Sequence, residues 1–263
     1  MNRSAKIPGP ARGAIGATIA SGAIGAFSGA PAKLSALFHR RYPSVAVTGI
    51  TGVGKTRLAD RLARRVSDAG TVDVGSAVME RRPRSSARGR GFRFRVVPGD
   101  NAATRLGALD EVFHDDPVDG VLHVVAWGHA TPRRTAGVSG SAQATREAQL
   151  AAELEDWAVT SHLVASMAVR REKPIWLVIV VTKADLFEGD LDEALRYYSP
   201  GSGSPFGQKL DELRALAGGA RLSIDVLPMC SPEGSTGGEG EQGRCDERLT
   251  ALETRLEQLS GHV

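Results

Sequence analysis

Short apolar runs alternate with amphipathic segments from residue 43 to the end of the chain. The apolar runs have the length of strands and occupy residues 44–49, 92–97, 118–127, 174–181 and 221–229. Two of them, 118–127 and 174–181, are almost continuously apolar, which is typical of parallel strands covered on both faces. We also expect a strand over residues 72–80, followed by a hairpin tip over residues 83–91, which are rich in Arg, Ser and Gly.

Helical spacing appears between these runs. Residues 56–66 place Leu58, Leu62 and Val66 four apart, and a further helix is expected to begin near Ala102. Residues 143–171 show a longer helical pattern, whose expected buried side consists of Leu150, Leu154, Trp157, Leu163 and Met167.

A closing helix is expected over residues 247–259, after a loop over the glycine-rich residues 232–243. Strands that alternate with helices predict an α/β fold of three layers. We expect a mostly parallel sheet of about six strands with helices on both faces, formed by residues 43–263.

The charge of the chain is unevenly distributed. Residues 1–100 contain 18 Lys and Arg against 5 Asp and Glu, and the remainder contains 15 against 25. A basic half can meet phosphates or anionic lipid, or it can be a solvated surface rich in arginine. No aromatic residues alternate with the arginines and no zinc spacing accompanies them, so no specific nucleic-acid partner is expected. The two cysteines, Cys230 and Cys245, have no metal-binding spacing, which favours a reducing, cytoplasmic setting.

Residues 1–42 differ from the rest and are expected to form a separate Ala- and Gly-rich leader. Residues 13–32 carry no charge and are flanked by basic residues, a length that suits a membrane contact. Five glycines weaken an isolated helix, so a flexible or loosely helical leader is equally compatible. A secretory signal ending at Ala30-Pro31-Ala32 is a third alternative.

The strongest chemical motif joins the first strand to the first helix. The segment from Gly49 through Thr51, Gly52, Val53 and Gly54 to Lys55 and Thr56 matches the pattern G-x-x-x-x-G-K-[ST]. Glycines let successive backbone N–H groups converge on a phosphate, and the helix N-terminus adds partial positive charge. The motif places Lys55 on the β- and γ-phosphates and the Thr56 hydroxyl on Mg²⁺. The chain is therefore expected to bind a nucleoside triphosphate.

A second motif indicates which base is bound. Thr182-Lys183-Ala184-Asp185 follows the apolar run 174–181 directly. A carboxylate at Asp185 suits guanine, because it accepts hydrogen bonds from both N1–H and the exocyclic amine. The stem of Lys183 would cover the purine plane.

Together the two motifs resemble those of the P-loop GTPases, the superfamily that includes Ras-like and Era-like G domains of the TRAFAC type. The TKADL sequence is also similar to that of bacterial G domains in secretion or defence systems. The resemblance implies a G domain over residues 43–263 that binds GTP or GDP with Mg²⁺. It further implies a base-contacting loop at Cys230 and Ser231, where Pro232 makes the match loose.

The chain departs from the family at the γ-phosphate. The family's D-x-x-G motif is replaced by Val96-Val97-Pro98-Gly99, so Gly99 is kept and the acid is lost. Asp100 stands where the family positions the attacking water, and it is expected to act there, to approach the metal, or to cap the helix near Ala102.

The switch threonine that binds Mg²⁺ is expected at Thr71, with Ser76 as the alternative. Arg133 and Arg134 are either arginine fingers or solvated loop residues.

These features support three hypotheses. In the first, the chain is a GTPase switch with slow hydrolysis, in which Lys55, Gly99 and Asp100 act on the γ-phosphate and a protein effector or activator reads the result. In the second, it is a GTP-sensing scaffold that does not hydrolyse. In the third, it is an ATPase or a small-molecule kinase. In the first two it is expected in the cytoplasm, with membrane association through residues 13–32 left open.

Overall fold

The computed structural model describes residues 42–63, 80–85, 91–99, 102–131, 145–230 and 239–261. All of these residues belong to one compact unit, Tyr42–Val263. Its strands are β1 (Ser44–Thr48), β2 (Glu80–Ser85), β3 (Gly91–Val96), β4 (Gly120–Val125), β5 (Ile175–Val181) and β6 (Leu222–Pro228). Its helices are α2 (Lys55–Leu62), α3 (Ala102–Asp110), α4 (Arg146–Arg170), α5 (Leu191–Tyr197), α6 (Pro205–Ala217) and α7 (Glu239–Leu259), with a π-helical turn η1 (Glu111–Asp115) and a 3₁₀ segment η2 (Ala184–Asp190).

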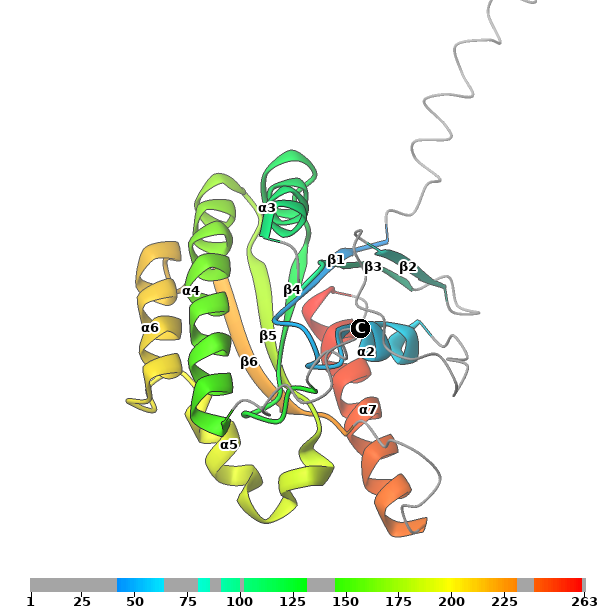
Figure 1. Ribbon diagram of the computed structural model, residues 1–263. Coiled ribbons are helices and arrows are strands. Elements are labelled where there is room, and N and C mark those ends of the chain that lie inside the picture. The colour runs from blue at the N-terminus through cyan, green and yellow to red at the C-terminus, as the bar shows by residue number, and fades with distance from the viewer. Residues whose placement is uncertain are drawn as a thin grey trace, which may run out of the picture. The chain divides into compact units, whose positions relative to one another are not determined.

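The six strands form one sheet in the order β2-β3-β1-β4-β5-β6. All neighbouring pairs are parallel except β2 and β3, which form an antiparallel hairpin at one edge. Helices cover both faces, as Figure 1 shows: α3, α4 and α6 lie on one side, and α2 and α7 on the other. The predicted fold class, an α/β sheet of about six mostly parallel strands between two helical layers, is confirmed.

Alternation along the central strands divides the core between the two faces. On β5, Leu177 and Ile179 pack with the α4 and α6 side, whereas Val178 and Val180 pack with the α2 and α7 side. Each of these four side chains is fully buried. This burial on both faces explains why the run 174–181 is continuously apolar.

The helical stripes meet the sheet largely as expected. Leu58 and Leu62 of α2 are buried, and so are Trp157 and Met167 of α4. The other three positions expected on the buried side of α4 are partly buried and pack against the same core: Leu150, Leu154 and Leu163. Val66, the third position of the α2 stripe, lies outside the described residues.

Two sequence-based expectations about local structure are wrong. The hairpin strand β2 runs over Glu80–Ser85, so residues 83–85 pair with β3 and do not belong to a hairpin tip. Only residue 80 of the expected strand 72–80 is described, and it is the first residue of β2. An edge strand tolerates arginines and Pro83 because it needs hydrogen bonds on one side only. The glycine-rich loop expected over residues 232–243 is likewise too long, since α7 begins at Glu239.

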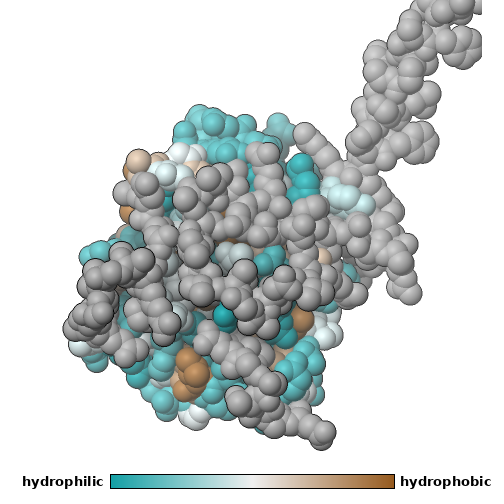
Figure 2. All heavy atoms as spheres, turned by 45° about the vertical axis from the view of Figure 1, so that its right-hand side comes forward, coloured by the Kyte–Doolittle hydropathy of each residue, from teal (hydrophilic) through white to brown (hydrophobic). Residues whose placement is uncertain are grey.

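The described surface is mostly hydrophilic on the side that Figure 2 shows, where teal predominates over brown. The large exposed apolar side chains are distributed over four elements: Leu106 on α3, Val159 and Val169 on α4, Leu186 on η2, and Leu216 on α6. Single apolar side chains on a surface are common in soluble domains.

Candidate nucleotide-binding site

Because the central strands are parallel, their carboxyl ends meet at one edge of the sheet. Thr48 of β1 is level with His123 of β4, and Val125 of β4 is level with Val181 of β5. Four segments therefore leave the sheet at the same edge. They are the segment Gly49–Thr56 after β1, which we call the phosphate loop, the segments after β3 and β4, and the Thr182–Asp185 motif after β5. Ligands of open α/β sheets bind at this edge.

The phosphate loop has a backbone that requires glycine. Gly49, Gly52 and Gly54 have φ angles of 129°, 80° and 89°. A Cβ atom at Gly49 would overlap the Val124 carbonyl oxygen, and one at Gly52 would overlap that of Thr131. The loop is thus packed closely against the segment after β4, with side-chain-free backbone where a phosphate would sit.

Positive charge is concentrated at the end of this loop. Lys55 is the first residue of α2, and its Nζ donates to the carbonyl oxygens of Gly49 and Ile50, both at 2.8 Å. Gly54 occupies the N-cap position without a side-chain cap. Thr56 follows in the first turn and is partly exposed. A folded-back lysine and an uncapped helix N-terminus at one place form a suitable environment for an anion.

The segment after β3 brings Gly99 to the phosphate loop. A Cβ atom added at Gly99 would lie 2.6 Å from Thr51 Oγ1 and 2.8 Å from Lys55 Nζ. Gly99 is thus within contact distance of the amine that the motif assigns to the β- and γ-phosphates. Val96, which stands in the place of the family's acid, is buried with 1% of its surface exposed. It is an apolar core residue of β3, and its side chain has no atom that could bind a metal.

The first residue of the predicted base motif binds the phosphate loop directly. Thr182 Oγ1 lies 2.7 Å from the Val53 carbonyl oxygen and 2.9 Å from that of Val125. Both Thr182 and Val53 are fully buried. Two motifs separated by more than a hundred residues of sequence therefore share a hydrogen bond in the interior.

Lys183 is held in a specific conformation by the segment after β4. It is one of two described non-glycine residues with positive φ, at 58°. Its Nζ donates to the His129 carbonyl oxygen at 2.7 Å and to Thr131 Oγ1. The Thr131 amide in turn donates to the Gly52 carbonyl oxygen at 3.0 Å. The segment Ala126–Thr131, which we call the bracket loop, thus connects the base motif to the phosphate loop.

Asp185 and Cys230 lie next to each other along the same edge. Asp185 is partly exposed in the first turn of η2. The Ala184 amide donates to the Met229 carbonyl oxygen at 3.1 Å, which brings the end of β6 beside the motif. Cys230 follows Met229, and its side chain is buried, so the group it presents toward a base would be backbone.

The bracket loop and the buried residue that supports it were not predicted from the sequence. Trp127 has a φ of 49°, and its ring contacts those of His129 and Phe187, with the Arg146 guanidinium 3.6 Å from its centroid. Glu153 Oε1 accepts a hydrogen bond from the Ala126 amide at 2.9 Å, and the Gly128 amide also donates to this carboxylate. The available signal was the pair Trp127-Gly128 directly after an apolar strand, a position where α/β proteins build ligand sites.

Burial dominates the electrostatics of Glu153. It raises the pKa of this carboxyl group to about 7, and the hydrogen bonds from Tyr198, Ala126 and Gly128 only partly oppose that rise. The Tyr198 hydroxyl donates to Oε2. A carboxyl group that titrates near neutrality therefore supports the bracket loop.

A second buried cluster lies between α3, α4 and β4. Arg105 forms an ion pair with Asp156, whose pKa is raised by burial against the opposing charges of Arg105 and Lys55. His123 shares a hydrogen bond of 2.9 Å with Thr48 Oγ1. The pKa of His123 lies well below its ordinary value, mainly because the ring is buried and also because of the positive charges of Arg105 and Lys55. The His123 imidazole is therefore neutral. The charge of Lys55 thus acts on groups that join α3 to α4.

Several predicted residues lie outside the described residues. These are Asp100, Thr71 and its alternative Ser76, Ser231, Arg133, Arg134 and the leader segment 13–32. In the ranges that the structure describes, no helix is long and apolar enough to cross a membrane. The same ranges hold no group of three or more His, Cys, Asp or Glu side chains arranged to bind a metal.

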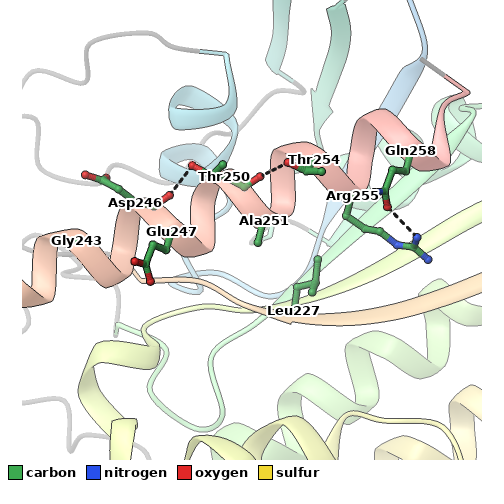
Figure 3. A pocket seen from close by; sticks show the side chains of 9 residues that line it. All are labelled: Leu227, Gly243, Asp246, Glu247, Thr250, Ala251, Thr254, Arg255 and Gln258. Atoms are coloured by element: carbon green, nitrogen blue, oxygen red, sulfur yellow. Dashed lines mark hydrogen bonds between the residues drawn. The ribbon is translucent and has the colours of Figure 1, made fainter. Parts of the chain in front are cut away.

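A groove of about 720 Å³ lies elsewhere, between β6 and α7 (Figure 3). Leu227 faces Ala251 across it, and the hydroxyls of Thr250 and Thr254 donate back to carbonyl oxygens of their own helix. No residue of the phosphate loop or of the Thr182–Asp185 motif lines it. The groove is therefore separate from the candidate site.

The chain was also compared with protein families, with curated proteins and with solved structures. No protein-family model matches the sequence, and no curated protein matches it. Among solved structures, the chain is similar to a chain of the mammalian SRP receptor, with 15% identity and a TM-score of 0.45 over 82% of this chain and 99% of that chain.

Proposed function

We propose that this protein binds GTP and GDP together with Mg²⁺ and acts as a conformational switch that hydrolyses GTP slowly. The observation that carries the proposal is the hydrogen bond from Thr182 Oγ1 to the Val53 carbonyl oxygen. It joins a phosphate-binding loop to a guanine-type motif at the carboxyl edge of one sheet. A chance glycine turn would not bring both motifs together at this edge.

The phosphate end follows from the loop geometry. Backbone amides of Gly52, Val53 and Gly54 would surround the β-phosphate, and Lys55 would exchange its two carbonyl partners for β- and γ-phosphate oxygens. Thr56 at the start of α2 would supply a hydroxyl to Mg²⁺, which takes its remaining ligands from phosphates and water. Thr71 is proposed as the second protein ligand of the metal.

The base end follows from Lys183 and Asp185. The bracket loop holds the Lys183 amine, and the Lys183 stem would then cover the purine ring of a bound nucleotide. Asp185 would accept from guanine N1–H and from the exocyclic amine, a pair of donors that adenine lacks. Cys230 and Ser231 would contact the base through their backbone.

Hydrolysis is proposed to be slow because the γ-phosphate side departs from the family. Gly99 lies near Lys55 and would offer its amide to the γ-phosphate, but buried Val96 offers no acid toward the metal. Asp100 is the proposed water-positioning residue. A protein effector or activator would bind where nucleotide changes the segment around residues 98–105.

The alternative is a GTP-sensing scaffold domain that does not hydrolyse, which Val96 specifically favours. In both cases a cytoplasmic location is proposed, with residues 13–32 as the segment that would contact a membrane. Deletion of residues 1–40 tests that contact, because membrane fractionation would then fall if the segment is responsible.

The proposal is tested by calorimetry with GTP, ATP and xanthosine triphosphate. Wild type should prefer GTP over ATP. Asp185→Asn should lose about 10- to 100-fold in GTP affinity, on the order of 1–3 kcal/mol, and gain affinity for the xanthine nucleotide, whose edge accepts the new amide donor. Asp190→Asn, an exposed carboxylate in the same segment, is the matched control and should leave the preference unchanged.

Two outcomes separate the candidate functions. Stable GTP binding with no phosphate release would replace the switch with the non-hydrolysing scaffold. A preference for ATP that Asp185→Asn does not alter would replace both with an ATPase or kinase.

A further inference from the structure

The chain has two cysteines, and the fold brings them together beside the base motif. Cys230 follows the end of β6, and Cys245 lies in the second turn of α7. Both are free thiols, with 2% and 0% of their surfaces exposed. Fifteen residues of sequence separate them, and Cys245 alone lies within a helix.

Three contacts hold Cys230 beside Cys245 and its neighbours on α7. Arg248 lies one helical turn after Cys245 on the same face of α7, and its Nη1 donates to Cys230 Sγ at 3.1 Å. The Cys230 side chain also lies close enough to Cys245 to raise the pKa of the Cys245 thiol.

Arg61 of α2 supplies the third contact, since its Nη1 donates to the Cys230 carbonyl oxygen at 3.1 Å. Its other nitrogen lies 3.5 Å from Asp246, the residue after Cys245. Figure 1 shows α2 and α7 on the same side of the sheet. Arginines from the two helices α2 and α7 therefore hold Cys230 next to the Cys245 thiol.

We propose that Cys230 and Cys245 form a redox modification site, at which hydrogen peroxide produces an intramolecular disulfide. A disulfide forms when its two sulfurs can reach bonding distance with little backbone movement, which suits two buried thiols that Arg248 and the end of β6 hold beside each other. Peroxide is the oxidant of suitable size because both thiols are buried and a bulkier disulfide reagent could not reach them. This inference goes beyond the proposed function and does not depend on it.

The reaction balances in two steps. Cys230 sulfur attacks one peroxide oxygen, the O–O bond breaks, and the departing hydroxide leaves as water with the thiol proton, which gives a sulfenic acid. Cys245 sulfur then attacks the sulfenic sulfur, the S–S bond forms, the S–O bond breaks, and a second water leaves. Two thiols and one hydrogen peroxide thus give one disulfide and two waters.

The groups around the two thiols indicate which sulfur reacts first with peroxide. The guanidinium of Arg248 contacts Cys230 sulfur, where it stabilises negative charge during the attack on peroxide. Burial, and then the Cys230 side chain, raise the pKa of Cys245 to about 12, so that Cys245 remains a thiol. Cys230 is therefore the peroxide-reactive sulfur and Cys245 the resolving one.

The crosslink would join α7 to the loop proposed to touch the base. Met229, which precedes Cys230, accepts the hydrogen bond from the Ala184 amide. Cys230 is thus one residue away from a hydrogen bond to the Thr182–Asp185 motif. A crosslinked loop would open less readily, which slows escape of a nucleotide.

The test treats the full chain with hydrogen peroxide and measures intact mass, peptide connectivity without reductant, and Tm. Wild type should lose about 2 Da, the mass of two hydrogens, and yield a Cys230–Cys245 peptide. The closed loop should raise Tm by roughly 5 °C, reversibly with a thiol reductant.

Cys245→Ser and Cys245→Ala should instead gain oxygen on Cys230 and show no rise in Tm. Arg248→Gln should slow the reaction of wild-type cysteines.

Oxygen addition to wild-type Cys230 without a disulfide, or no reaction in folded protein, would overturn the proposal. Mixed disulfides with oxidised glutathione would also overturn it, since they require an accessible thiol. In protein loaded with a fluorescent GDP analogue, oxidation should slow release about fivefold in wild type only. Unchanged release from the crosslinked protein would overturn the effect on the base loop, whereas no binding of the analogue would count against the proposed function alone.

Discussion

The two ends of the candidate site are held together in different ways. At the phosphate end, Lys55 binds carbonyl oxygens five and six residues earlier in the same loop. At the base end, Thr182 reaches a carbonyl oxygen 129 residues away, and Lys183 reaches one 54 residues away. The phosphate end is therefore local in sequence, while the base end depends on packing between distant elements.

This difference determines which changes each end tolerates. The phosphate loop needs its own glycines and a helix that begins at Lys55, and both lie within eight residues of sequence. The base end needs the bracket loop, which Glu153 of α4 supports from the core. A substitution in α4, far from either motif in sequence, should thus alter the base end before the phosphate end.

Lys55→Ala should have the largest effect, because it removes the charge that the proposal places between the β- and γ-phosphates. GTP affinity should fall about a thousandfold, on the order of 4 kcal/mol, in calorimetry at pH 7.5. Lys209→Ala, an exposed lysine on α6, is the control and should bind as wild type does. Retained binding by Lys55→Ala would mean that the base end alone holds the nucleotide.

Glu153→Gln tests the support of the base end, because it should change how the free energy of unfolding depends on pH. Because burial raises the pKa of Glu153 from 4.5 to about 7, the native state binds an extra proton between these values. The contribution of the protonated Glu153 carboxyl group to the free energy of unfolding is fully present below pH 4.5. It is lost as the pH rises from 4.5 to 7. Wild type should therefore lose about 3 kcal/mol of unfolding free energy over this window relative to the variant.

Urea unfolding of both proteins at pH 4.5 and at pH 7.5 measures this difference. Glu155→Gln is the matched control, since Glu155 lies on the exposed side of the same helix. The control should follow the wild-type pH dependence. Parallel curves for wild type and Glu153→Gln would contradict a raised pKa at this carboxyl group.

Thr182→Val has the smallest expected effect and tests the bond that joins the two ends. The isosteric change removes the hydroxyl from the Val53 and Val125 carbonyl oxygens and leaves both buried. GTP affinity should fall about tenfold, near 1.4 kcal/mol, with fluorescent GDP released faster. Thr250→Val removes a hydroxyl that bonds a carbonyl oxygen of its own helix at an exposed position of α7, and the GTP affinity of this variant should not change. Equal affinities for the two variants would mean that the ends act independently.

The parts of the fold that the sequence predicted are those with strong local patterns. Buried strands such as β4 and β5 appear as apolar runs because both of their faces are covered. The hairpin strand β2 was placed wrongly because an edge strand carries arginines and a proline, which local propensity disfavours. The start of α7 was placed too late, since Gly240 and Gly243 weaken a helix unless tertiary contacts support it.

The sequence by itself determined the phosphate loop, because its geometry comes from glycines and a helix start within one short segment. It also located the Thr182–Asp185 motif at the end of a buried strand. Only the tertiary structure decided that the bracket loop fixes Lys183, that Glu153 supports this loop, and that Cys230 meets Cys245. The physical reason is that backbone conformation and strand burial depend on neighbouring residues, whereas buried hydrogen bonds depend on which distant segments the folded sheet brings to the same edge.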